Sequence, residues 1–141
     1  MKILVINGPN INMLGIREPE VYGQVDHSEL EALATAWGAE LGFDVQVSQS
    51  DDESELIAWL HQASDLDQPV IINPAAFTHY SYALRDAVAA APLVIEVHLT
   101  NPAAREAFRH NSVISGVVEG TIAGFGIDSY RLALAALVEL V

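Results

Sequence analysis

A tyrosine and an arginine in one irregular segment are the first residues of this chain that could do chemistry. Arg17 and Tyr22 lie five residues apart between Asn7 and Val25, in a stretch without helical or strand periodicity. A guanidinium beside a tyrosine favours the phenolate and lowers the pKa of the hydroxyl from about 10, which would make Tyr22 a usable general base. The alternative is that Tyr22 packs this segment onto the rest of the protein while Arg17 lies in solvent.

A carboxylate and a histidine two residues apart form the second candidate. Glu96 and His98 lie near the end of an apolar run, and alternate residues of a strand point to the same side. Glu96 could hold one imidazole nitrogen and leave the other facing a ligand, as a general acid requires. The alternatives are a structural histidine or a metal ligand, but His79, His98 and His110 show no His-x-His or His-x-x-x-His spacing.

An asparagine at the end of another apolar run is the third candidate. The Asn73 amide can both donate and accept hydrogen bonds, which suits recognition of hydroxyl groups. Residues Asn73–Thr78 should form a turn into a helix, and the first backbone amides of that helix would favour an anion. Asn73 could equally be an ordinary turn asparagine.

Several common kinds of catalysis lack their residues in this sequence. The only lysine, Lys2, lies at the outer start of the first apolar run, which argues against Schiff-base chemistry. The sequence has no Walker motif, no glycine-rich dinucleotide fingerprint after that run and no Gly-x-Ser-x-Gly elbow. Gly124–Ser129 is better explained as a turn from a strand into a helix. The remaining possibility is acid–base chemistry by Tyr, His, Arg and carboxylates, and we expect no cofactor and no metal.

Composition limits the partners and the location of the protein. The 141 residues suit one domain over residues 1–141, and 51% of them are apolar, which is enough for a core. The net charge of −13 makes nucleic acid and anionic membranes poor partners. The sequence shows no membrane-spanning run, signal peptide or cysteine, which favours the cytoplasm. An anionic small molecule would need some of the six Lys and Arg residues to gather locally.

Apolar runs that alternate with helical patterns predict the elements that position these residues. The alternation indicates βαβ units and a parallel sheet. The predicted strands are Ile3–Ile6, Phe43–Val47, Pro69–Ile72, Leu93–Val97 and Val117–Ala123. The predicted helices are His27–Leu41, Asp52–Asp65, Tyr80–Ala90, a short one at Ala103–Phe108, and Asp128–Leu140. We expect an α/β fold with a flavodoxin-like, doubly wound five-stranded parallel sheet, strand order 2-1-3-4-5, and helices on both faces.

This topology would bring the candidate residues together. Ligands of doubly wound sheets bind outside the carboxyl ends of the strands, where the strand order reverses. The reversal lies between strands one and three, so the site should involve Asn7–Val25, Asn73–His79 and His98–Asn101. The first of these segments is longer than an ordinary connection and contains several apolar residues, which favours a lid or a binding loop.

The same segments resemble a known family, type II 3-dehydroquinate dehydratase. The opening block, NGPNINMLGIREPEVYG at Asn7–Gly23, resembles the first signature of that family. Later blocks are similar and occur in the same order: NPAAFTH at Asn73–His79, ALRDA at Ala83–Ala87, EVHLTN at Glu96–Asn101 and REAFRH at Arg105–His110. The resemblance covers essentially the whole chain.

The resemblance implies a reaction and a set of catalytic roles. It implies anti elimination of water from 3-dehydroquinate through an enolate, giving 3-dehydroshikimate in the shikimate pathway of aromatic amino acid biosynthesis. By position, Tyr22 would remove the proton beside the ketone, and Arg17 would favour its phenolate. His98, oriented by Glu96, would protonate the departing hydroxyl, and Asn10 would help to hold a water near the enolate oxygen.

The resemblance also implies a substrate-binding set and an assembly. The residues that would bind the hydroxyls and the carboxylate of the substrate are Asn73, His79, Leu99, Thr100 and Arg109. Asp86 would act from a neighbouring subunit, in an oligomer that the resemblance implies is a dodecamer of trimers.

A few positions differ from the commonest pattern of the family. Ala75-Ala76-Phe77 stands where glycine and tyrosine are frequent, and Thr100 stands where serine is usual. Ser129 replaces a usual glycine, and Met13 replaces an arginine that some members carry. None of these differences removes a proposed catalytic group, so they bear on affinity and loop closure rather than on the reaction.

Two other functions stay open at the level of sequence. One is a non-catalytic flavodoxin-like domain, although the acidic residues and lysine of a receiver domain and the phosphate loop of a flavin carrier are absent from the expected places. The other is a related lyase or isomerase that acts on another cyclic polyol acid with the same Tyr, Arg and His side chains.

Overall fold

Five parallel strands form one sheet in the computed structural model, which describes residues 1–16, 18, 20 and 25–141. The strands are β1 (Lys2–Asn7), β2 (Asp44–Gln49), β3 (Val70–Asn73), β4 (Val94–His98) and β5 (Gly120–Ala123). Their order across the sheet is β2-β1-β3-β4-β5, and every neighbouring pair is parallel. The predicted doubly wound fold and its strand order are therefore confirmed.

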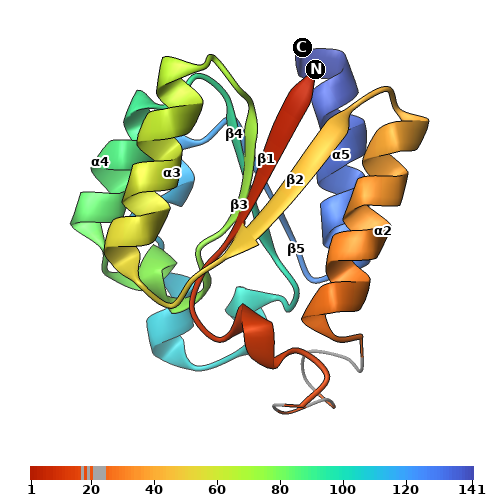
Figure 1. Cartoon of the computed structure of the whole chain (residues 1–141). Coiled ribbons are helices and arrows are strands. Elements are labelled where there is room, and N and C mark those ends of the chain that lie inside the picture. The colour runs from red at the N-terminus through yellow and green to blue at the C-terminus, as the bar shows by residue number, and fades with distance from the viewer. Residues whose placement is uncertain (17, 19, 21–24) are drawn as a thin grey trace.

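Two pairs of helices cover the two faces of the sheet (Figure 1). The helices are α2 (His27–Glu40), α3 (Glu53–Asp65), α4 (Tyr82–Ala90) and α5 (Asp128–Leu140). Helices α3 and α4 lie against one face, and α2 and α5 lie against the other. The predicted start of α2 is confirmed, because the Asp26 side chain accepts a hydrogen bond from the Glu29 backbone N–H.

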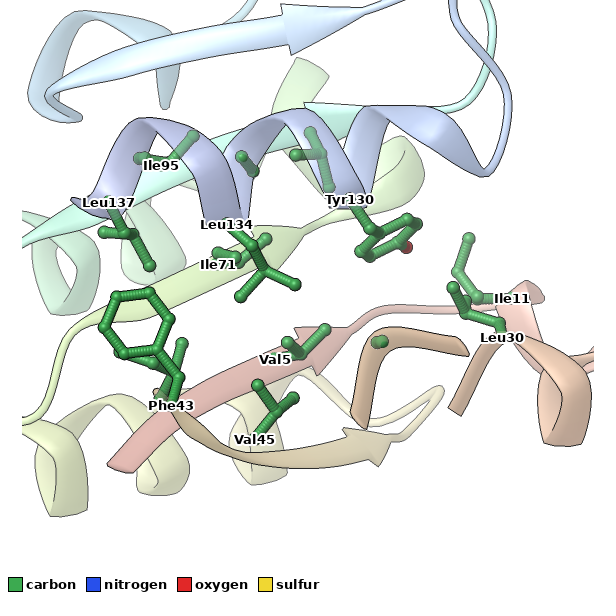
Figure 2. Close-up of a cluster of buried hydrophobic side chains, with 14 of the residues drawn as sticks. Val5, Ile11, Leu30, Phe43, Val45, Ile71, Ile95, Tyr130, Leu134 and Leu137 are labelled. Carbon is green, nitrogen blue, oxygen red and sulfur yellow. The ribbon is translucent and has the colours of Figure 1, made fainter. Parts of the chain in front are cut away.

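Each face of the sheet has its own apolar core. Figure 2 shows the core under α2 and α5, where Leu134 and Leu137 of α5 pack toward Val5 and Ile71 of the sheet. The second core joins strand residues such as Leu4 and Ile6 to α3 and α4. Burial on both faces explains why the central strands read as continuous apolar runs.

The chain between β4 and α5 differs from the prediction. The predicted helix Ala103–Phe108 is wrong, because two short 3₁₀ helices, η3 (Pro102–Ala104) and η4 (Ala107–His110), stand in its place. Arg105 separates them with an extended backbone (φ −114°, ψ −160°), which no continuous helix allows. The last strand begins at Gly120 rather than at Val117, because Ser115–Val117 forms another 3₁₀ turn, η5.

The carboxyl ends of the strands gather the irregular segments at one end of the molecule, the lower end in Figure 1. Asn7 and Asn73, the last residues of β1 and β3, are direct register partners. The next residue, Gly8, donates its backbone N–H to the Asn73 carbonyl at 2.8 Å. A Cβ on Gly8 would lie 2.8 Å from the Pro74 carbonyl oxygen, so only glycine allows the segments after β1 and β3 to approach this closely.

None of the helices in the described part of the chain is long and apolar enough to cross a membrane.

Candidate active site

A pocket lies outside the carboxyl ends of β1, β3 and β4, at the point where the strand order reverses. Its walls come from the segment after β1, the turn after β3 and the segment after β4. The predicted site residues that the structure brings together around it are Asn10, Asn73, His79, His98, Leu99, Thr100 and Arg109. Met13 also lines this pocket, so the position that differs from the family pattern borders the predicted site.

Four predicted site residues remain to be placed: Tyr22, Arg17, Asp86 and Glu96. Tyr22 and Arg17 lie outside the described residues, so their roles stay predictions. Asp86 is on α4 with its side chain 77% exposed, next to Arg85 at 3.4 Å, and it is not among the residues that line the pocket. Glu96 is completely buried behind His98 rather than facing the pocket.

Glu96 and His98 form a close pair at the end of β4. The His98 Nε2 lies 2.5 Å from the Glu96 Oε2, which leaves Nδ1 as the ring nitrogen that can serve the pocket. Burial alone would raise the pKa of the Glu96 carboxyl, but the hydrogen bond and charge of His98, together with two hydroxyl donors, outweigh it and lower the pKa. Glu96 is therefore a carboxylate at neutral pH.

The two hydroxyl donors to Glu96 come from outside β4, and sequence reasoning missed both. Thr78 in η2 (Ala75–His79) donates to the Glu96 Oε2 at 2.7 Å, and Ser115 in η5 donates to Oε1 at 2.6 Å. Ser112 lies 2.6 Å from the Thr78 hydroxyl. Thr78 belongs to a segment that the sequence singled out, but no motif or spacing in the sequence indicates Ser112 or Ser115.

Asn73 is held by a buried tyrosine that the sequence analysis also missed. The Tyr130 hydroxyl donates to the Asn7 side chain at 2.7 Å and accepts from the Asn73 Nδ2 at 3.0 Å. The Asn73 Oδ1 accepts the Ala75 backbone N–H at 3.1 Å and so fixes the turn after β3. Ala75 has a φ of 52°, a conformation that favours glycine, which explains why glycine is frequent at this position of the family pattern.

Two arginines, Arg105 and Arg109, form part of the pocket wall that comes after β4. The Arg109 Nε donates to Glu106 at 2.7 Å, and its guanidinium lies 4.6 Å from the centre of the Phe108 ring. Arg105 donates to the Thr100 hydroxyl at 3.2 Å and also lines the pocket. These cations gather against the overall charge of −13, as binding of an anion would require.

Arg105 is a further lining residue that the prediction did not include. Its signal was its place in the REAFRH block, four residues before Arg109. On the same side of the pocket, the His79 Nδ1 lies 2.7 Å from the Asn111 carbonyl oxygen, so the other ring nitrogen is available to a ligand. No three His, Asp or Glu side chains are grouped as metal ligands among the residues that the structure describes.

Comparison with known proteins identifies the family of this chain. The sequence profile described as "Dehydroquinase class II" matches residues 1–138. The chain belongs to the class II dehydroquinase family. A 3-dehydroquinate dehydratase of Salinispora tropica is 54% identical over 136 residues, covering 95% of this chain and 94% of the relative. One from Thermus thermophilus is also 54% identical, over 139 residues, with 97% and 93% covered.

Solved structures of class II dehydroquinases have the same fold. The type II dehydroquinase of Propionibacterium acnes matches with a TM-score of 0.96 at 51% identity, covering 98% of this chain and 96% of that chain. The type II dehydroquinase of Butyrivibrio crossotus matches with a TM-score of 0.95 at 42% identity, covering 97% of each chain. The sequence resemblance to the family is thereby confirmed over almost the whole chain.

Proposed function

We propose that this class II dehydroquinase is a hydro-lyase that converts 3-dehydroquinate into 3-dehydroshikimate in the shikimate pathway. The observation that carries the proposal is the buried Glu96–His98 pair, which presents one imidazole nitrogen to a pocket with arginines in its wall. The substrate is a cyclic polyol acid. Its carboxylate needs a cation, the proton beside its ketone needs a base, and its hydroxyls need hydrogen-bonding groups such as amides. The family match over residues 1–138 supports the same reaction.

The proposed reaction begins with removal of a proton beside the ketone. Tyr22 would be the base, and Arg17 would favour its phenolate by charge. The electron pair of the broken C–H bond moves into the ring and forms an enolate. Asn10, at the pocket, would help to hold a water that donates a hydrogen bond to the enolate oxygen.

The second half of the reaction expels the hydroxyl on the opposite face of the ring. His98 would give its Nδ1 proton to that oxygen while the enolate returns to a ketone and the C–O bond breaks. Glu96 would stabilise the imidazolium before this transfer and orient its ring. Anti elimination requires the base and the acid on opposite faces of the substrate, as a pocket between the segment after β1 and the end of β4 allows.

The remaining pocket residues would bind the substrate. Arg109 supplies positive charge for the carboxylate, and Asn73 and His79 supply hydrogen bonds for hydroxyl groups. Leu99 and Thr100 follow His98 directly, so their backbone and the Thr100 hydroxyl lie at the same wall.

The family resemblance supports an assembly and a location as further parts of the proposal. In a dodecamer of trimers, Asp86 would reach the site of a neighbouring subunit, in keeping with its exposed side chain. Residues 1–141 would act as one catalytic domain in the cytoplasm.

One assay tests the proposed reaction directly. The purified protein is incubated with 3-dehydroquinate in the presence of EDTA, and the conjugated enone of 3-dehydroshikimate is followed by its ultraviolet absorbance. We expect turnover that EDTA does not reduce. Absence of product at micromolar enzyme would contradict the proposal, and turnover of only another cyclic polyol acid would point to a related lyase.

A further inference from the structure

We propose that Ser115 and Thr78 are positioning residues for the general acid, which hold Glu96 as an oriented carboxylate so that His98 keeps both ring protons until the leaving hydroxyl takes one. The inference rests on the proposed function, in which His98 is that acid. It assigns a positioning role to two hydroxyls whose residues are not among those that line the pocket.

The Glu96 carboxylate receives a donor from each of three separate segments. His98 of β4 and Thr78 of η2 lie 2.5 Å and 2.7 Å from Oε2, and Ser115 of η5 lies 2.6 Å from Oε1. The Glu96 residue is 0% exposed, so these three side chains, rather than bulk water, stabilise its charge. A buried charge without such partners would take up a proton instead.

The direction of the hydrogen bonds follows from the contacts of Ser112. Its Oγ accepts the backbone N–H groups of Ile114 at 3.0 Å and Ser115 at 2.9 Å, which occupy both lone pairs. Its own proton is therefore directed to the Thr78 oxygen, 2.6 Å away. Thr78 must then donate its single proton to Glu96, so the chain runs from Ser112 through Thr78 to the carboxylate.

This arrangement decides which nitrogen of His98 loses a proton. Because the Thr78 and Ser115 hydroxyls both donate to Glu96, they favour its charged form, and the proton between Glu96 and His98 stays on Nε2. When the C–O bond breaks, its electron pair goes to oxygen, which takes the proton from Nδ1. His98 is left as a neutral imidazole with its proton on Nε2.

Ser115 is the more informative of the two hydroxyls to remove. It donates to Oε1, and it belongs to a surface turn rather than to the core. Without it, Glu96 should draw the Nε2 proton toward itself and weaken His98 as an acid. We expect Ser115→Ala to lower kcat roughly 5- to 50-fold, the effect of one lost charge-assisted hydrogen bond, with KM changed less than about twofold.

The test compares three variants of the full-length protein. Ser115→Ala removes the hydroxyl, and Ser115→Thr keeps one and should recover most of kcat. Ser64→Ala is the matched control, because its hydroxyl bonds to the Ala90 carbonyl oxygen far from the pocket, and it should leave kcat unchanged. A Ser115→Ala variant with normal kcat, or with a raised KM as its main defect, would overturn the proposal.

A spectroscopic readout separates positioning from general destabilisation. In protein with ¹⁵N-labelled histidine and no substrate, the His98 Nε2 should give the signal of a protonated nitrogen. Ser115→Ala should move it toward the signal of an unprotonated nitrogen, and an unchanged signal would contradict the inference. If the wild-type protein shows no turnover of 3-dehydroquinate, the proposed function fails, but this measurement still decides whether the hydroxyls control the proton.

Discussion

At the scale of single residues, the chemistry of this protein depends on groups that are weak in water and become effective through their neighbours. Glu96 can stay ionised while completely buried because His98, Ser115 and Thr78 donate to it. An unpaired carboxylate at the same place would be neutral and could not stabilise an imidazolium. The family resemblance assigns Tyr22 the complementary role of base.

Replacement of Tyr22 tests that role. Tyr22→Phe should lose at least about two orders of magnitude in turnover, because the base disappears while the ring remains. Binding of the substrate should persist, which calorimetry on the inactive variant can measure. Tyr82→Phe is the matched control, since Tyr82 is 70% exposed and does not line the pocket. Near-normal turnover by Tyr22→Phe would mean that another group is the base.

Tyr130 offers a second prediction at this scale. It is fully buried, and its hydroxyl joins Asn7 to Asn73, so Tyr130→Phe removes the donor to the Asn7 Oδ1 and the acceptor of the Asn73 Nδ2. We expect the free energy of unfolding in urea to fall by about 1–3 kcal/mol. KM should rise as well, because the Asn73 amide loses an anchor. Removal of the exposed Tyr80 hydroxyl, in Tyr80→Phe, should change neither quantity.

At the scale of elements, the fit of helices on the sheet determines which residues are tolerated. Gly38 of α2 faces Val45 of β2 so closely that a Cβ on Gly38 would lie 2.2 Å from the Val45 Cγ2. Alanine is normally the better helix residue by about 1 kcal/mol. At this position the overlap outweighs that preference, because both residues are buried.

A pair of substitutions measures this contact. Gly38→Ala should destabilise the protein by about 1–3 kcal/mol in urea unfolding, and much less when Val45→Ala has already removed the methyl groups. Gly120→Ala is the control, because a Cβ on Gly120 meets nothing within 4 Å. If the losses of unfolding free energy in Gly38→Ala and Val45→Ala simply add in the double variant, the contact between these residues is not the cause of the destabilisation.

At the scale of the whole molecule, the proposed function would divide the site between the chain and a neighbouring subunit. Asp86 is exposed on α4 and is not among the residues that line the pocket of its own chain. A site that includes the Asp86 of a neighbouring subunit would therefore be complete only in the oligomer. This would explain why Asp86, a residue of the family pattern, does not lie with the other predicted site residues of its own chain.

Mixing of two inactive variants tests this division. Asp86→Ala and His98→Asn should each be inactive, and co-expression should restore about a quarter of the sites if a neighbour supplies Asp86, because such a site needs one subunit of each kind. Activity is measured on the mixed oligomer and on each variant alone. Activity no greater than the sum of the separate variants would place Asp86 outside the neighbour's site.

The sequence by itself determined the order of the strands and the segments at which the pocket lies. Its periodicity is local, so His27–Leu41 and Asp128–Leu140 were predicted within one residue of α2 and α5. It failed at Ala103–Phe108, where a short apolar pattern could not reveal the extended backbone of Arg105.

Only the tertiary structure decided how the functional groups are supported. Tyr130 meets Asn7 across 123 positions of sequence and Asn73 across 57, and Ser115 meets Glu96 across 19. No local pattern encodes such contacts, because they depend on how strands and helices pack in three dimensions. The sequence motifs therefore indicated Glu96 and His98 as site residues, whereas only the packing of the folded chain brings the Thr78 and Ser115 hydroxyls to the Glu96 carboxylate.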